Sequence, residues 1–173
     1  HRRKNTHVVC FDEFGPIELR PAHGSVWAKR GKVNRLPATY RRPHGVRHFL
    51  AFYDLRQDQL WGYIRTRKRT REVLDVLKWL RKRYPQNERI FLVLDNFSPH
   101  ISNSVKDWAK ENRVTLIYTP TNASWLNRIE CQFTELRKFV FENTYYQKHE
   151  DVKSAINRFL AYRNSRNRKR KKT

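Results

Sequence analysis

The sequence predicts an α/β protein built on a mixed β-sheet with helices on both faces. Its first part contains short strand-like segments separated by turn residues, which is typical of antiparallel hairpins. Its later part alternates strand-like runs with amphipathic helical patterns, which is typical of parallel strands covered by helices. Between the two parts, Phe91-Leu92-Val93-Leu94 is an unbroken apolar run that ends abruptly at Asp95. Such a run indicates a fully buried central strand.

Four segments of the first part have the apolar, β-branched pattern of strands and are bounded by Gly, Pro or polar residues. In order they are 7–14, 25–28, 46–54 and 60–64. The last two are expected to form a hairpin, because only a polar turn separates them. The stretch 29–45 is rich in Lys, Arg, Pro and Gly and is expected to be a loop.

The later part predicts helices between strands. Val73, Leu74, Leu77, Trp79 and Leu80 lie close to helical spacing and predict a helix that ends before Pro85. Strands are expected at 89–95 and 114–118, and helices at 99–111, 125–142 and 151–163. The apolar stripe of the helix 125–142 comprises Leu126, Ile129, Phe133, Leu136 and Val140. We expect one domain over residues 1–165, followed by a basic tail at 166–173 that is disordered.

The charge of the chain indicates a polyanionic partner. Its 173 residues include 38 Lys and Arg against 16 Asp and Glu, which gives a net charge of +22. An excess of this size favours nucleic acid over a merely solvated basic surface. The two cysteines, Cys10 and Cys131, are too few for a disulfide framework or a four-ligand zinc site and are expected to be buried and inert. We expect no membrane span and no signal peptide, and a chain that starts at His1 without any Met is expected to be a fragment.

Three acids are predicted to meet at one edge of the sheet. Asp12 and Asp95 come near the ends of strands that are expected to be neighbours, and Glu130 lies at the rim of the apolar stripe of the following helix. Converging carboxylates repel one another unless a cation neutralises them. Oxygen ligands favour a hard ion such as Mg²⁺ or Mn²⁺, and two such ions suit phosphodiester chemistry.

The residues alone also allow simpler roles for each acid. Asp12 could accept a turn hydrogen bond, with Glu13 as the ligand instead. Asp95 and Asn96 could cap the next helix. Glu130 could pair with Arg137 or Arg128 on the helix surface. These alternatives stay open on pattern alone.

Three segments carry a family resemblance. They are Val8-Val9-Cys10-Phe11-Asp12-Glu13-Phe14-Gly15-Pro16, Leu94-Asp95-Asn96-Phe97-Ser98-Pro99-His100, and Tyr118 to Glu130 (YTPTNASWLNRIE). In this order, and with 34 residues between Asp95 and Glu130, they resemble the DDE catalytic domain of bacterial insertion-sequence transposases in the mariner superfamily. The resemblance covers about residues 6 to 165.

The resemblance implies an RNase H-like, retroviral integrase-like fold, with a five-stranded sheet whose first three strands are antiparallel. It also implies DNA cleavage and strand transfer with a divalent metal held by Asp12, Asp95 and Glu130. Arg128 departs from the family pattern, where many relatives have Pro, and should not abolish metal binding. Such transposases carry N-terminal helix-turn-helix modules, and none precedes His1, so sequence-specific DNA recognition is not expected in this chain.

Other polar residues are candidates for supporting or binding roles. Asn96, His100 and Asn127 are candidates to support the acids; a structural role is at least as consistent with His100, and it is favoured for Asn127. The phosphate-binding candidates are Arg65, Arg67, Lys68, Arg69 and Arg71, with the loop 29–42 and the tail 166–172 as further basic segments. Trp27 and Trp61 could stack on bases, but core packing is the commoner role of Trp in strands, and Trp125 is expected in the core.

These predictions combine into the catalytic domain of a DDE transposase that acts on double-stranded DNA, both transposon ends and target. Its cofactor is expected to be two Mg²⁺ or Mn²⁺ ions. The full-length protein is expected to be a homodimer in its synaptic complex and to work in the bacterial cytoplasm on the nucleoid. The alternatives are an RNase H-like metal nuclease that hydrolyses without joining, and a non-catalytic DNA-binding remnant of a transposase.

Overall fold

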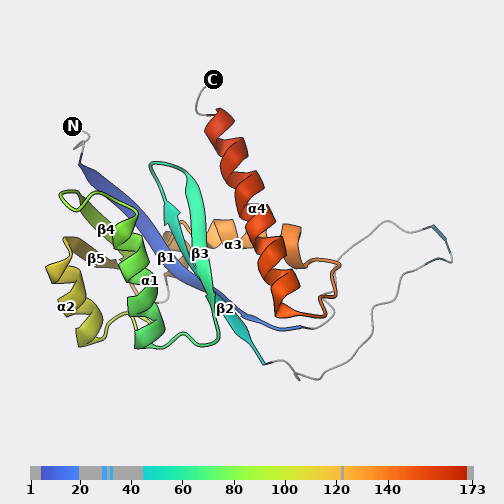
Figure 1. Ribbon diagram of the computed structural model, residues 1–173, viewed down its shortest axis with the longest axis horizontal. Helices are drawn as coiled ribbons and strands as arrows, with labels where there is room; N and C mark the ends of the chain where they lie inside the picture. The colour runs from blue at the N-terminus through green and yellow to red at the C-terminus, as the bar shows by residue number, and fades with distance from the viewer. Residues whose placement is uncertain (1–4, 20–28, 31, 33–44, 122, 171–173) are drawn as a thin grey trace.

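The computed structural model describes residues 5–19, 29–30, 32, 45–121 and 123–170. The strand predicted at 25–28, with Trp27, and most of the loop 29–45 lie outside the described residues. The described part contains five strands and four α-helices arranged in three layers (Figure 1). This confirms the α/β class predicted from the alternation of strand and helix patterns.

The five strands form one mixed sheet. They are β1 (Thr6–Ile17), β2 (Arg47–Asp54), β3 (Gln59–Arg65), β4 (Arg89–Leu94) and β5 (Val114–Tyr118), in the spatial order β3-β2-β1-β4-β5. Strands β1, β2 and β3 pair antiparallel, whereas β4 runs parallel to both β1 and β5. The five-stranded sheet with three antiparallel strands is therefore confirmed. The central position of β4 explains its apolar run, because both of its faces are covered.

Two helices cover each face of the sheet (Figure 1). Helices α1 (Thr70–Lys82) and α2 (Asn103–Glu111) lie on one face, and α3 (Glu130–Leu136) and α4 (His149–Arg170) lie on the other. Alternate residues of β1 feed the two cores: Val9 and Phe11 pack toward α1 and α2, and Cys10 and Phe14 pack toward α3 and α4. The period of two in a strand thus sends Asp12 to the α3 face and Glu13 to the α2 face.

The helix predicted over 125–142 is interrupted. The chain forms a short 3₁₀ turn, η1 (Ser124–Leu126), then α3, then a π-helical segment, η2 (Arg137–Phe141). Leu126 is 53% exposed and Trp125 is 73% exposed. The prediction that both lie in the core is therefore wrong. The other four members of the apolar stripe, from Ile129 to Val140, are buried, because the helical period holds only from Ile129 onward.

Two other boundaries and the exposure of one cysteine differ from the predictions. Helix α2 begins at Asn103 instead of near Pro99, since a turn occupies the residues between them. Helix α4 extends from His149 to Arg170, so the segment expected to start a disordered tail at 166 is helical that far, with Asn167 buried. Cys10 is buried as expected, but Cys131 is exposed. Within the described ranges, no helix is long and apolar enough to cross a lipid bilayer.

Candidate active site at the carboxyl ends of β1 and β4

The parallel register of β1 and β4 brings two of the predicted acids level with each other. Cys10 pairs with Val93, and Asp12 and Asp95 each lie two residues further along their strands. Neighbouring strands are about 4.8 Å apart, so both acids emerge at the same edge of the sheet. Sheets of this kind place their ligands at the carboxyl ends of the strands.

Asp12 is buried among like charges. Its side chain accepts a hydrogen bond from the backbone N–H of Glu13 at 2.8 Å, and the residue is only 9% exposed. Burial, followed by the charges of Glu13, Glu130 and Asp95, raises the pKa of Asp12 to about 7 against the lowering effect of that hydrogen bond. Asp12 therefore lies within electrostatic range of both other predicted acids, and no compensating cation pairs with it among the described residues.

Asn127 connects the third acid to the first. Its amide nitrogen donates to the backbone carbonyl of Phe11 at 2.9 Å and lies 3.5 Å from Oδ2 of Asp12. The backbone carbonyl of Asn127 accepts a hydrogen bond from the backbone N–H of Glu130, the first residue of α3, at 3.0 Å. Asn127 is 1% exposed, and its Oδ1 is buried with no hydrogen-bond partner among the described groups. This side chain anchors the start of α3 to β1 and holds Glu130 near Asp12.

Asp95 is held by a buried histidine. Oδ1 of Asp95 lies 2.7 Å from Nδ1 of His100 and accepts the backbone N–H of Phe97 at 3.1 Å. Nε2 of His100 lies 2.7 Å from Oε1 of Glu13, and His100 is fully buried. Burial opposes protonation of His100, but its hydrogen bonds to Asp95 and Glu13 raise its pKa to about 9. The hydrogen bond to His100 in turn lowers the pKa of Asp95.

Glu13 therefore has a role that the sequence reasoning missed. The sequence suggests Glu13 only as a metal ligand in place of Asp12. In the structure, the Glu13 side chain lies on the opposite face of β1 from Asp12 and contacts His100. Nζ of Lys68 lies 3.5 Å from Oε2 of Glu13 and 4.2 Å from the centre of the Phe97 ring. Strand alternation is the signal that separates Glu13 from Asp12.

The structure shows only some of the simpler roles that the sequence allows for the acids. Asp12 does accept a local backbone hydrogen bond, from Glu13. Neither Asp95 nor Asn96 caps α2, whose N-cap residue is Ser102. The Asn96 side chain instead donates to the carbonyl of Thr119 at 2.7 Å and joins the loops that follow β4 and β5. In the described part of the chain, Glu130 forms no ion pair with Arg128 or Arg137.

The donor set suits a hard divalent cation, although it is not closed around one. Among the described residues, no three His, Cys, Asp or Glu side chains are arranged to enclose a metal ion. The predicted ligands Asp12, Asp95 and Glu130 nevertheless offer only carboxylate oxygens, which Mg²⁺ and Mn²⁺ prefer. The pKa of Asp12 is raised mainly by burial and then by the neighbouring carboxylates, and a bound cation would oppose both effects. The residues present therefore fit such an ion.

The basic segment predicted to bind phosphates is partly engaged within the protein. Its members are Arg65, Arg67, Lys68, Arg69 and Arg71. Arg69 forms an ion pair with Glu72 at 2.8 Å, and Lys68 contacts Glu13. Arg65 lies 5.5 Å from the centre of the Tyr63 ring. Arg67 and Arg71 are exposed.

Sheet order, strand directions and helix placement define the RNase H-like fold class, with acids at the carboxyl ends of its central strands. The family model of the DDE superfamily endonucleases matches residues 7–153, and the chain belongs to this family. Membership implies the use of a divalent metal. The family resemblance drawn from the three segments is confirmed.

Known relatives agree with this assignment. The insertion element IS630 uncharacterized 39 kDa protein of Shigella sonnei is 25% identical over 139 residues, which cover 79% of this chain and 40% of that protein. The chain thus spans less than half of the length of this curated relative.

Solved structures share the fold at low sequence identity. The Mos1 mariner transposase catalytic domain has a TM-score of 0.64 and 11% identity, with 92% of this chain and 72% of that chain covered. The Mos1 paired-end complex with the left transposon end has a TM-score of 0.67 and 13% identity, with 92% and 49% covered. A simian T-cell lymphotropic virus intasome has a TM-score of 0.59 and 10% identity, with 90% and 49% covered.

Proposed function

We propose that this chain is the catalytic domain of an insertion-sequence transposase that cleaves double-stranded DNA at transposon ends and joins the ends to target DNA. The observation that carries the proposal is the buried edge where Asp12 meets the charges of Asp95 and Glu130, in a chain of the DDE endonuclease family. The net charge of +22 supports a DNA substrate. The Mos1 complexes with transposon ends also support it.

Asp12, Asp95 and Glu130 are the proposed ligands of two Mg²⁺ or Mn²⁺ ions. Bound there, the ions supply Lewis-acid stabilisation of the charge that develops on the phosphate and on the attacking and leaving oxygens. Asp12 serves as a ligand only after releasing its proton, since the metal-free carboxyl has a pKa of about 7. The affinity for metal is therefore expected to rise with pH.

The surrounding side chains position these ligands. His100 and Glu13 fix the orientation of the Asp95 carboxylate through two bonds of 2.7 Å. Asn127 fixes β1 relative to the start of α3, which carries Glu130. Residues around metal ligands commonly change metal affinity by about 10- to 100-fold when they are replaced.

The proposed reaction has two phosphodiester displacements. In cleavage, a water oxygen attacks phosphorus and the bond to the 3′ oxygen of the transposon end breaks. In joining, the freed 3′ oxygen attacks a target phosphodiester and displaces its 3′ oxygen. A homodimer that holds two ends would carry out both displacements in the full-length protein, and the bacterial nucleoid would supply the target DNA.

The test compares the wild-type chain with Glu130→Gln, and uses Glu111→Gln, an exposed acid of α2, as the matched control. Calorimetric titration with Mn²⁺ and nicking of a supercoiled plasmid are measured for each protein. We expect saturable metal binding and nicking in the wild type and the control, and loss of both in Glu130→Gln. Equal metal binding in all three without nicking would contradict the proposal and leave a DNA-binding remnant.

A second assay separates the transposase from a plain nuclease. Precleaved duplex ends with a free 3′-hydroxyl are incubated with plasmid and Mn²⁺, and joined products are measured. Covalent joining supports strand transfer. Hydrolysis without joining, with preference for RNA–DNA hybrids, identifies an RNase H-like nuclease instead.

A further inference from the structure

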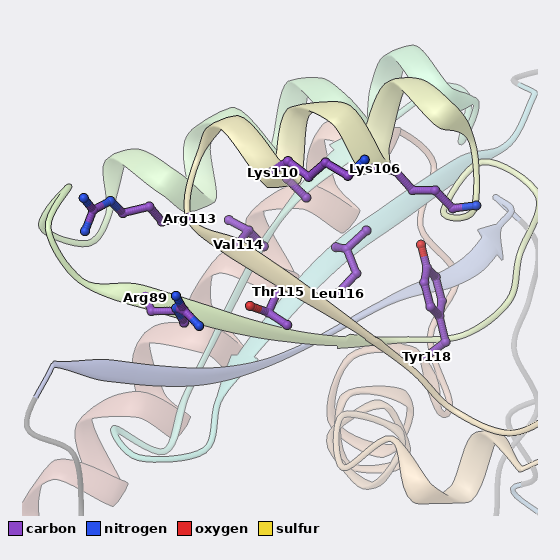
Figure 2. Close-up of a pocket in the computed structure, with 9 residues that line it drawn as sticks. Arg89, Lys106, Lys110, Arg113, Val114, Thr115, Leu116 and Tyr118 are labelled. Atoms are coloured by element: carbon purple, nitrogen blue, oxygen red, sulfur yellow. The ribbon is translucent and has the colours of Figure 1, made fainter.

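A basic groove runs along the outer edge of the sheet, apart from the acids. It lies between β5, an edge strand, and α2, and it has a volume of about 580 Å³. Figure 2 shows Arg89 and Arg113 at one end of the groove, Lys110 in its middle and Lys106 near Tyr118 at the other end. We define the basic groove by its four cations, Arg89, Lys106, Lys110 and Arg113.

Within the part of the chain that the structure describes, these cations have no carboxylate partner. All four residues are exposed, and no ion pair with a carboxylate is found for any of them within the described ranges. The other residues that line the groove are apolar or uncharged: Ala109, Val114, Thr115, Leu116 and Tyr118. The basic groove is thus a concave surface with uncompensated positive charge over an apolar floor, in contrast to the segment 65–71, where Lys68 and Arg69 already contact acids.

One end of the basic groove lies near the sheet edge that carries the acids, on the α2 side of the sheet. Tyr118 pairs with Leu94, the residue before Asp95, and its hydroxyl donates to the carbonyl of His100 at 3.0 Å. A polyanion that occupies the carboxylate edge can therefore continue past Tyr118 into the groove. The opposite end, at Arg89 and Arg113, lies near the starts of β4 and β5.

The length of the groove suits a nucleic-acid backbone. From Val114 to Tyr118, β5 rises by about 13 Å at roughly 3.3 Å per residue. Along the duplex axis, one DNA strand carries a phosphate about every 3.4 Å, and successive phosphates lie farther apart along the strand itself. A groove of this length therefore spans a few phosphates of one strand.

We propose that the basic groove binds the phosphate backbone of the DNA that extends away from the carboxylate edge. The proposal rests on the proposed function only in taking DNA as the substrate. The contacts are to phosphates, so they add affinity without reading sequence. Binding through these contacts depends on salt, because each phosphate contact releases condensed counterions.

The test measures DNA affinity against salt concentration for the full chain in EDTA, which prevents cleavage. The groove variant combines Arg89→Gln, Lys106→Gln and Lys110→Gln, and Arg113 is kept because its φ is 55°. The control variant loses the same charge through Lys78→Gln, Lys148→Gln and Lys153→Gln, which are exposed residues of α1 and of the α4 region. Fluorescence anisotropy of a short labelled duplex reports binding, and thermal unfolding checks the fold of each variant.

The groove variant is expected to lose about 2.7 from the slope of log affinity against log salt, at roughly 0.9 per phosphate contact. When the salt concentration rises fourfold, the fold-loss of DNA affinity of the groove variant should then be about 40 times smaller than the fold-loss of the wild type. The control variant should keep a slope close to that of the wild type.

Equal slopes for the groove and control variants would overturn the groove proposal while leaving metal-dependent nicking, and hence the proposed function, intact. Binding of poly-glutamate is measured in parallel. If the groove variant loses poly-glutamate binding but keeps the wild-type DNA slope, the groove binds an acidic polypeptide and the proposal is wrong. If the wild type does not nick DNA but the groove variant still shows the expected smaller salt slope, the proposed function is contradicted and the groove proposal stands.

Discussion

Replacing Asp12 with Asn is expected to stabilise the metal-free fold while abolishing cleavage. Burial, followed by the charges of Glu13, Glu130 and Asp95, raises the pKa of Asp12 from 3.8 to about 7. A rise of about three pKa units corresponds to a free-energy difference on the order of 4 kcal/mol between the two protonation states. Asn removes the charge and keeps an oxygen for the backbone N–H of Glu13, which donates at 2.8 Å.

The sign of the effect follows from proton binding. Between about pH 4 and pH 7, the folded Asp12 carboxyl keeps a proton that the unfolded chain releases, so the stability of the wild type falls as pH rises through this window. In urea unfolding with EDTA, Asp12→Asn should match the wild type at about pH 4 and exceed it by roughly 2–4 kcal/mol at about pH 8. Asp107→Asn, an exposed acid of α2, is the control and should change little at either pH. An Asp12→Asn chain less stable than the wild type at the higher pH would refute the reasoning.

Three further predictions concern contacts around and beyond the site. His100→Phe removes the histidine partner of the Glu13 carboxylate, whose side chain is 5% exposed, and leaves Lys68 at 3.5 Å; it should cost roughly 1.5–3 kcal/mol in urea unfolding, and an unchanged unfolding midpoint would contradict this. Tyr84→Phe removes the 2.6 Å hydrogen bond to buried Asp54 and should cost about 1.5–3 kcal/mol, with nicking per folded molecule unchanged. Trp125→Ala should leave stability within about 0.5 kcal/mol because the ring is 73% exposed, and a larger loss in thermal unfolding would mean that the ring packs in a core.

The sheet was predictable because its strands carry local signals. The apolar run of β4 ends at Asp95, and the segment containing Asp12 has the same character, so adjacent parallel placement brings the two acids level. The helix that follows β5 was not predictable to the same degree. Its apolar stripe extends back to Leu126 in sequence, but the Asn127 side chain bonds to the β1 backbone, and regular helix starts only at Glu130.

Two features depend on tertiary placement and have no local signal. Strand alternation separates Asp12 from Glu13, but only the fold reveals that His100 lies on the Glu13 face. The basic groove draws its cations from positions between Arg89 and Arg113, on a strand, a helix and a turn. A consecutive basic run such as 65–71 is conspicuous in sequence, yet part of its charge is neutralised inside the protein.

The two strand acids differ in how their charge is compensated. The chain supplies its own cation to Asp95 through His100, whose pKa is raised to about 9 by its two carboxylate partners against the effect of burial. The described part of the chain supplies none to Asp12, so the metal-free fold retains an electrostatic cost at that position. A divalent cation bound there would favour the ionised carboxylate, release a proton and stabilise the fold, by about 2.7 kcal/mol at a hundred times its dissociation constant. Under the proposed function, the residue that weakens the metal-free fold would thus be the one that couples metal binding to folding.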